Sequence, residues 1–109
     1  MTATAHQRAA CLLEHAKHAV ALTGAGISTP SGIPDFRSPG TGMWESLDAQ
    51  AVISGPGFRA DPERFFRWLG GLARQTEAAQ PNAAHIALAQ LEQQGRLHAV
   101  ITQNVDSVQ

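Results

Sequence analysis

The sequence has little of what secreted, membrane-spanning and nucleic-acid-binding proteins use. One cysteine in 109 residues excludes a disulfide within the chain. No apolar run approaches the roughly 20 residues that a membrane-spanning helix needs, and the N-terminus lacks the pattern of a secretion signal. Lysine and arginine number 8 against 9 acidic residues, so the net charge is −1, and there is no basic run. These absences predict a cytoplasmic protein that contacts neither nucleic acid nor membrane directly.

The single cysteine, Cys11, also excludes a zinc site built from several thiolates. Cys11 lies among alanines and leucines, where Ala9, Leu12, Leu13 and Ala16 recur at helical spacing. This pattern predicts that Cys11 is a small buried hydrophobic side chain rather than a reactive thiol. We expect no metal ligands in this chain.

What the chain does contain is typical of one small globular domain, with 43% hydrophobic and 16% charged residues. Periodic apolar residues predict a helix over Arg8 to Lys17 and another over Pro62 to Ala78. In the second helix the apolar stripe is expected to face the core, and Gly70-Gly71 is a possible kink. A third helix should begin after Asn82, acting as its N-cap, and end at Gly95.

Two short apolar segments, Ala19 to Leu22 and Leu97 to Thr102, predict buried parallel strands. Each strand is followed by a polar loop, and helices lie between the two strands. This order is typical of an open α/β sheet, in which ligands bind at the carboxyl ends of the strands. We therefore expect both polar loops to meet in one crevice.

The first of these loops contains Gly24-Ala25-Gly26. Glycines at this position allow backbone N–H groups to approach a phosphate, because no Cβ blocks the way. The motif is incomplete, since Thr29 follows where the dinucleotide fingerprint has a third glycine. Gly24 and Gly26 are equally compatible with a tight turn alone. The stretch from Ser28 to Gly42 is rich in glycine and proline, which predicts a long loop, and long loops in compact domains are usually functional or disordered.

Three segments carry a family resemblance: Ala-Leu-Thr-Gly-Ala-Gly-Ile-Ser ending at Ser28, Gly-Ile-Pro-Asp-Phe-Arg-Ser ending at Ser38, and Ile-Thr-Gln-Asn-Val-Asp ending at Asp106. Together they resemble the NAD-binding core of the sirtuins. Asn82 and His85, within Pro-Asn-x-x-His, match the same pattern. The resemblance implies the first part of a Rossmann-like, doubly wound parallel sheet, which is incomplete in this chain, and an N-terminal portion of a catalytic domain over residues 1–109.

The activity that the resemblance implies is NAD-dependent protein lysine deacetylation, in which the acyl group passes to ADP-ribose and nicotinamide leaves. The substrate would be an acyl-lysine protein or peptide. Catalytic roles would fall to Asn104 and Asp106, and His85 would be structural. The implied cofactor-binding residues are Gly24, Ala25, Gly26, Ser28, Asp35, Phe36, Arg37, Gln103, Asn104 and Asp106. Asp35 could equally shape the loop, and Arg37 could be a solvated charge.

In the sirtuins a general-base histidine and a four-cysteine zinc module follow the Asn-x-Asp motif, and neither occurs before Gln109. We therefore expect zinc only in a full-length family member, and no turnover by the 109-residue chain alone. Two other functions remain open. One is a non-catalytic module that binds NAD or ADP-ribose, and the other is mono-ADP-ribosyl transfer, which uses the same cofactor.

Overall fold

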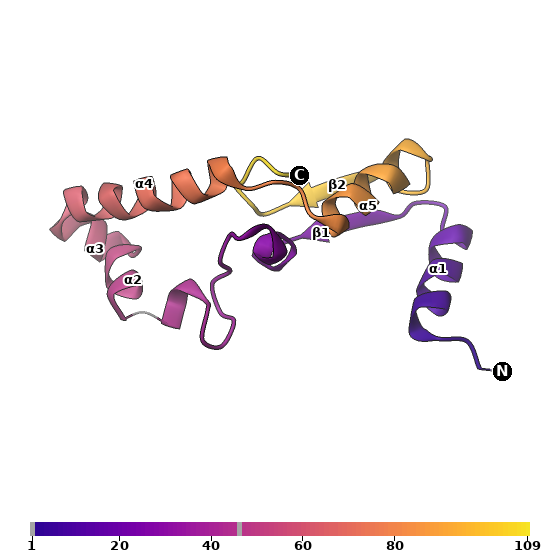
Figure 1. The fold of residues 1–109 in the computed structure, drawn as a ribbon, viewed down its shortest axis with the longest axis horizontal. Coiled ribbons are helices and arrows are strands. Elements are labelled where there is room, and N and C mark those ends of the chain that lie inside the picture. The colour runs from indigo at the N-terminus through magenta and orange to yellow at the C-terminus, as the bar shows by residue number, and fades with distance from the viewer. Residues whose placement is uncertain (1, 46) are drawn as a thin grey trace.

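The structure is a computed structural model that describes residues 2–45 and 47–109. It has an α/β half, formed by residues 5–31 and 83–102, and a helical arm, formed by residues 43–78 (Figure 1). The elements follow in the order α1 (Ala5–His15), β1 (Val20–Thr23), η1 (Ala25–Ser31), η2 (Met43–Glu45), α2 (Leu47–Val52), α3 (Gly55–Ala60), α4 (Pro62–Ala78), α5 (Ala83–Gln93) and β2 (Ala99–Thr102), where η denotes a 3-10 helix.

The two strands form a parallel sheet, which confirms the predicted α/β class. Val20 is opposite Ala99, and Thr23 is opposite Thr102. Two further backbone bonds extend the pairing at its ends. His98 N–H donates to the Ala19 carbonyl at 2.7 Å, and Gln103 N–H donates to the Thr23 carbonyl at 3.1 Å. The carboxyl ends of both strands therefore lie at the same edge.

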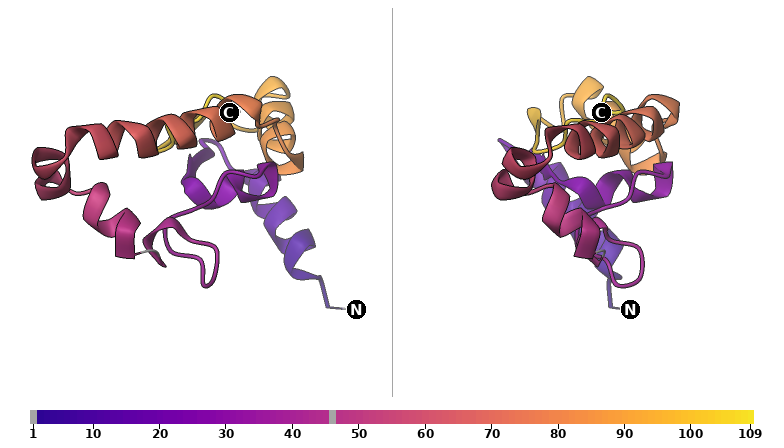
Figure 2. Two further views of the ribbon diagram at one scale, coloured as in Figure 1. Left: turned by 60° about the vertical axis from the view of Figure 1, so that its left-hand side comes forward. Right: turned by 90° about the vertical axis from the view of Figure 1, so that its left-hand side faces the viewer.

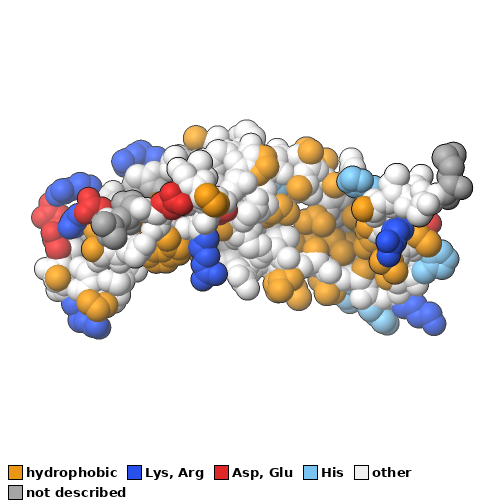
Figure 3. Space-filling view, turned by 90° about the horizontal axis from the view of Figure 1, so that it is seen from below, with side chains coloured by type: hydrophobic (Ala, Val, Ile, Leu, Met, Phe, Trp, Pro, Cys, Tyr) orange, Lys and Arg blue, Asp and Glu red, His pale blue; other side chains and the backbone are white. Residues whose placement is uncertain are grey.

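The prediction that these strands are buried is wrong. Val20, Leu22 and Ile101 are 54%, 69% and 54% exposed. Continuous apolar strands are typical of parallel sheets that are covered on both faces, and the described elements cover this sheet only in part. Figure 3 shows apolar side chains gathered in a hollow on the half that carries the sheet, while acidic side chains gather mostly at the end of the helical arm.

Local capping explains where most of the helices begin. Asn82 accepts hydrogen bonds from the first turn of α5, and Asp61, followed by proline, caps α4. Gly95, where the sequence predicted the end of this helix, has φ of +70° just after α5, the left-handed conformation that favours glycine. The segment from Gly55 to Gly57 begins α3 despite its two glycines and its proline. Ser54 is the N-cap of this helix, because its side chain accepts a hydrogen bond from the Gly57 N–H.

The helical arm makes the molecule elongated (Figure 2). Its radius of gyration is 17.7 Å, whereas a compact domain of this length has about 13 Å. α4 continues without a break through Gly70 and Gly71. Its apolar stripe does not form a core, since Phe66 and Leu69 are exposed. Within the described residues, no helix combines the length and the apolar character needed to cross a membrane.

α1 also departs from the expected burial. Cys11 is exposed on this helix, so the prediction of a buried thiol is wrong. The helix begins earlier than expected, at Ala5, because Thr4 and Gln7 form a capping box. The described buried apolar side chains are few and come from distant parts of the chain: Ile33, Ala49, Val52, Leu97 and Val108.

Gly57→Ala should destabilise the chain by about 1–3 kcal/mol, because a Cβ at this position would lie 1.8 Å from the Ala51 carbonyl oxygen. Gly55→Ala is the matched control in the same helix. Its Cβ would meet nothing closer than the Arg59 guanidinium at 3.6 Å, so the stability should change by less than about 1 kcal/mol. Urea unfolding followed by circular dichroism measures both, and equal effects would contradict the close approach of α2 and α3.

Candidate functional site

The two polar motifs meet at the carboxyl edge of the sheet, as the sequence predicted. The Asn104 side-chain Nδ2 donates to the Gly24 carbonyl at 3.0 Å. The Ser28 hydroxyl donates to Asp106 Oδ2 at 2.9 Å. Segments about 80 positions apart in the chain are thus joined by side-chain hydrogen bonds at one place.

The two glycines of the first motif have no evident structural need to be glycine. Neither has positive φ, and a Cβ built on Gly24 or Gly26 would meet no described atom within 4 Å. A turn requirement would show itself as a left-handed conformation or a close neighbour. The open space beside both residues instead suits the close approach of a ligand to the backbone.

The loop after η1 is closed by its own hydrogen bonds. Met43 N–H donates to the Asp35 carbonyl at 2.7 Å, and Trp44 N–H donates to the Phe36 carbonyl at 2.8 Å. The Phe36 ring lies beside Trp44 with a centroid distance of 5.8 Å. These contacts hold Phe36 at the edge of the site.

A cavity of about 150 Å³ lies between this loop, the end of α4 and the segment after β2. Whole ligands of drug size occupy pockets of roughly 300–1,000 Å³, so this cavity has room for only one part of a dinucleotide. Five residues expected from the sequence contribute to its wall: Ala25, Phe36, Gln103, Asn104 and Asp106. The other five do not line it: Gly24, Gly26, Ser28, Asp35 and Arg37.

Ser28 and His85 form the buried part of the site. Ser28 is 0% exposed and His85 is 6% exposed. His85 Nε2 lies 3.4 Å from the Ser28 hydroxyl oxygen. Ser28, which the sequence placed among the cofactor-binding residues, is thus fully buried in this structure, and its role towards the cofactor stays a prediction. Arg37 is exposed on the loop.

Sequence reasoning missed half of the cavity wall. The missed residues carry no chemical signal of their own, being mostly apolar, and they come from three separate segments: Ile33, Pro34, Met43, Thr76 and Val105. Thr76 is the clearest case, because it belongs to the last turn of α4. Only the tertiary arrangement brings α4 to this edge of the sheet.

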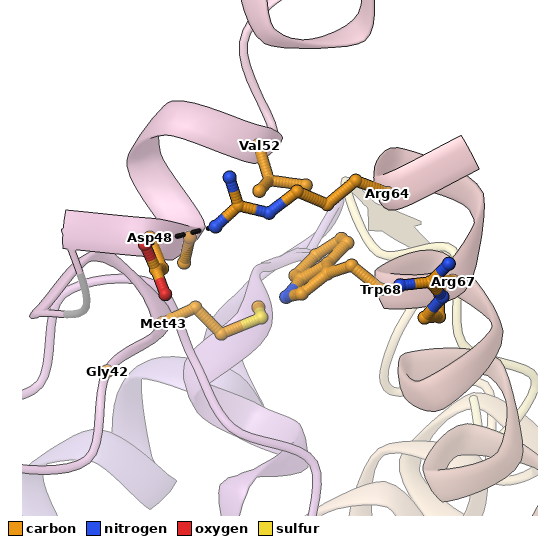
Figure 4. A pocket seen from close by; sticks show the side chains of 8 residues that line it. Gly42, Met43, Asp48, Val52, Arg64, Arg67 and Trp68 are labelled. Atoms are coloured by element: carbon orange, nitrogen blue, oxygen red, sulfur yellow. Dashed lines mark ion pairs between the residues drawn. The ribbon is translucent and has the colours of Figure 1, made fainter. Parts of the chain in front are cut away.

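A larger cavity, of about 480 Å³, lies elsewhere, between η2, α2 and α4 (Figure 4). Met43, Val52 and Trp68 give it an apolar floor. At its rim the Arg64 guanidinium pairs with Asp48 at 3.1 Å, with side chains 48% and 86% exposed. An ion pair as exposed as this contributes little. None of the residues that join the two motifs lines this cavity, so the smaller one is the candidate site.

Hydrogen bonds from Ser38 lower the pKa of Asp35 below its usual value. The main cause is the Ser38 hydroxyl. The Ser38 backbone N–H adds to it and donates to Asp35 Oδ1 at 3.0 Å. Because these bonds favour the ionised carboxylate, their stabilisation of the loop is present at neutral pH. It is lost as the pH falls through the lowered pKa.

Ser38→Ala should therefore raise the pKa of Asp35 towards its usual value, while leaving the backbone bond in place. A carbon-13 NMR titration of the Asp35 carboxyl measures this change. Ser54→Ala, which removes the α3 cap, should leave the Asp35 pKa as it was. An unchanged pKa in Ser38→Ala would mean that the hydroxyl bond is absent in solution.

Comparisons with known proteins agree with this geometry. The profile of the Sir2 family matches residues 24–109. NAD-dependent protein deacetylase 2 of Caldanaerobacter subterraneus subsp. tengcongensis is 45% identical over 102 residues, which cover 94% of this chain and 41% of the relative. The chain thus spans about two fifths of the length of this relative.

Solved structures give the same result. A Sir2 variant with a deacetylated p53 peptide and 3'-O-acetyl ADP-ribose superposes with a TM-score of 0.85 at 43% identity, covering 96% of this chain and 42% of that one. Sir2Tm bound to a propionylated peptide gives a TM-score of 0.77 at 41% identity, covering 94% of this chain and 39% of that one. The predicted Rossmann-like class and the sirtuin resemblance are both confirmed, and this chain belongs to the Sir2 family.

Proposed function

We propose that this chain carries the part of an NAD-dependent protein lysine deacylase that binds the pyrophosphate and nicotinamide ends of NAD. The observation that carries the proposal is the open backbone at Gly24 and Gly26 beside a cavity walled by Asn104 and Asp106. An anion fits the first feature and a small polar ring fits the second. NAD combines both, and the relatives are named for their dependence on it.

NAD supplies a glycosidic bond whose cleavage releases nicotinamide, and the chain's part is to bind and orient it. Asp106 is the proposed acceptor for the nicotinamide carboxamide. A carboxylate offers about four acceptor positions, and among the described residues Asp106 accepts two hydrogen bonds, from the Ser28 hydroxyl and from the Val108 N–H at 3.4 Å. Phe36 would cover the reacting ribose and exclude water. Asn104, held by Gly24, would face the same sugar.

An acyl-lysine side chain is the proposed second substrate. A cavity of about 350 Å³ adjoins the candidate site and shares Pro34 and Met43 with it. This neighbouring space is lined by α4 residues, including Trp68 and Leu72. An extended aliphatic side chain entering through it would bring its acyl group to the ribose end of the site. Among the structural relatives, Sir2 binds acetylated and propionylated peptides.

Gly26→Ala should weaken binding of both NAD and ADP-ribose at least about tenfold, because the new methyl group would occupy the space proposed for the pyrophosphate. Stability should be unchanged or rise by up to about 1 kcal/mol, since nothing in the fold opposes a Cβ there. Gly70→Ala on α4 is the control and should affect neither ligand. Titrations followed by nitrogen-15 NMR, with parallel urea unfolding, measure both properties. Unchanged affinity in Gly26→Ala would remove the proposed phosphate contact.

Asp106→Asn should weaken NAD binding by about 1.5–3 kcal/mol, the usual value of a hydrogen bond to a charged group. ADP-ribose has no nicotinamide, so its affinity should change by no more than about 0.5 kcal/mol. Asp48→Asn, at the rim of the cavity between η2, α2 and α4, should leave both affinities unchanged. Calorimetry with the two ligands makes the comparison. Equal losses for NAD and ADP-ribose would show that Asp106 acts on the fold and not on the carboxamide.

A further inference from the structure

A directional chain of hydrogen bonds runs from the first turn of α5 to Asp106. It passes through Asn82, His85 and Ser28. Ser28 and His85 are buried, so each polar atom on this path depends on the next for its partner. The donor and the acceptor in each of these hydrogen bonds follow from the chemistry of the two end groups, the Asn82 amide and the Asp106 carboxylate.

The first end is a backbone amide. The Asn82 N–H lies 3.1 Å from His85 Nδ1, and an amide can only donate. Nδ1 must therefore accept and carries no hydrogen. A neutral imidazole has one N–H, so the hydrogen of His85 is on Nε2, facing the Ser28 hydroxyl.

The other end is a carboxylate. Asp106, when ionised, can only accept, so the Ser28 hydroxyl gives its hydrogen to Oδ2 at 2.9 Å. The Ser28 oxygen is left to accept from His85 Nε2, 3.4 Å away. The Ser28 hydroxyl therefore donates its hydrogen to Asp106. This hydrogen bond fixes the orientation of the Asp106 carboxylate, which lines the cavity.

The Asn82 side chain joins α5 to η1. Its Oδ1 accepts from Ala84 N–H at 2.9 Å and from His85 N–H at 3.5 Å, which caps α5. Its Nδ2 donates to the Ile27 carbonyl at 2.7 Å and to the Ser31 hydroxyl at 3.0 Å. One side chain therefore starts the helix that carries His85 and holds the segment that carries Gly26.

We propose that Asn82 and His85 are positioning residues: Asn82 anchors η1 to α5, and His85, as the Nε2–H tautomer, directs the Ser28 hydroxyl onto Asp106. The inference rests on the proposed NAD site for its effect on ligand binding. The hydrogen-bond chain itself is a property of the free protein. The two parts are therefore tested by separate measurements.

The tautomer is read from the histidine side-chain nitrogens of the wild-type chain by long-range nitrogen-15 NMR at neutral pH. His85 should show a protonated Nε2 and a bare Nδ1. His15 provides an internal comparison, because its Nδ1 lies 2.8 Å from the Cys11 carbonyl oxygen and must donate to it. His15 should therefore favour the opposite tautomer. A protonated Nδ1 on His85 would overturn the proposed chain of hydrogen bonds.

Asn82→Asp and Asn82→Ala separate anchoring from capping. Aspartate caps a helix as well as asparagine does but loses both Nδ2 donors. Asn82→Asp should keep the α5 cap and the His85 tautomer. The loss of both Nδ2 donors, which leaves a carboxylate oxygen against the Ile27 carbonyl, should lower stability and reduce NAD and ADP-ribose affinity about tenfold. Asn82→Ala should lose the α5 cap as well. Asp61→Asn, the same exchange at the α4 cap in the opposite direction, should change neither affinity.

If Asn82→Asp bound both ligands as tightly as the wild-type chain does, Asn82 would be only a helix cap and the anchoring role would be overturned. A wild-type chain that bound neither NAD nor ADP-ribose would overturn the proposed function and, with it, the effect of Asn82 on ligand affinity. The His85 tautomer would still decide whether the hydrogen-bond chain exists.

Discussion

Parallel pairing of β1 with β2 is the constraint on which the candidate site depends. It places Thr23 opposite Thr102, so the residues that follow the two strands emerge side by side. Asn104 then reaches the Gly24 carbonyl, and Ser28 reaches Asp106. An antiparallel arrangement would send the two loops to opposite ends of the sheet, and none of these contacts could form.

The site is ordered by polar contacts more than by apolar packing. Three polar residues are buried among those described, and two of them, Ser28 and His85, belong to the hydrogen-bond chain. The third, Thr23, bonds Gln109 at 2.6 Å. No buried side-chain nitrogen or oxygen in the described part of the chain lacks a partner. Hydrogen bonds in such surroundings are strong when complete and costly when broken, which suits a site that must hold fixed orientations.

The helical arm contributes to the site through few residues. Thr76, in the last turn of α4, and Met43, at the start of η2, both reach the cavity wall. The ion pair between α2 and α4, Asp48 with Arg64, is largely exposed and adds little stability. The shape of the cavity therefore depends on where α4 lies, while the contacts between the two motifs depend only on the α/β half.

Features that depend on neighbours in the chain were determined by the sequence itself. Asn82 and Asp61 cap their helices and Gly95 has positive φ, because caps and turns depend on residues two to four positions away. The motifs after each strand could be assigned to one crevice, because parallel strands share an edge. The family followed from the same residues.

The tertiary structure alone decided which side chains are buried and which meet. Apolar periodicity indicated a buried sheet and a packed face on α4, yet Leu22 and Phe66 are exposed, because burial depends on what covers a face and not on the face itself. His85 and Ser28 lie 57 positions apart, and Ser28 and Asp106 lie 78 apart. No local sequence pattern predicts contacts across such separations. The hydrogen-bond chain exists only because the pairing of the two strands brings these residues together.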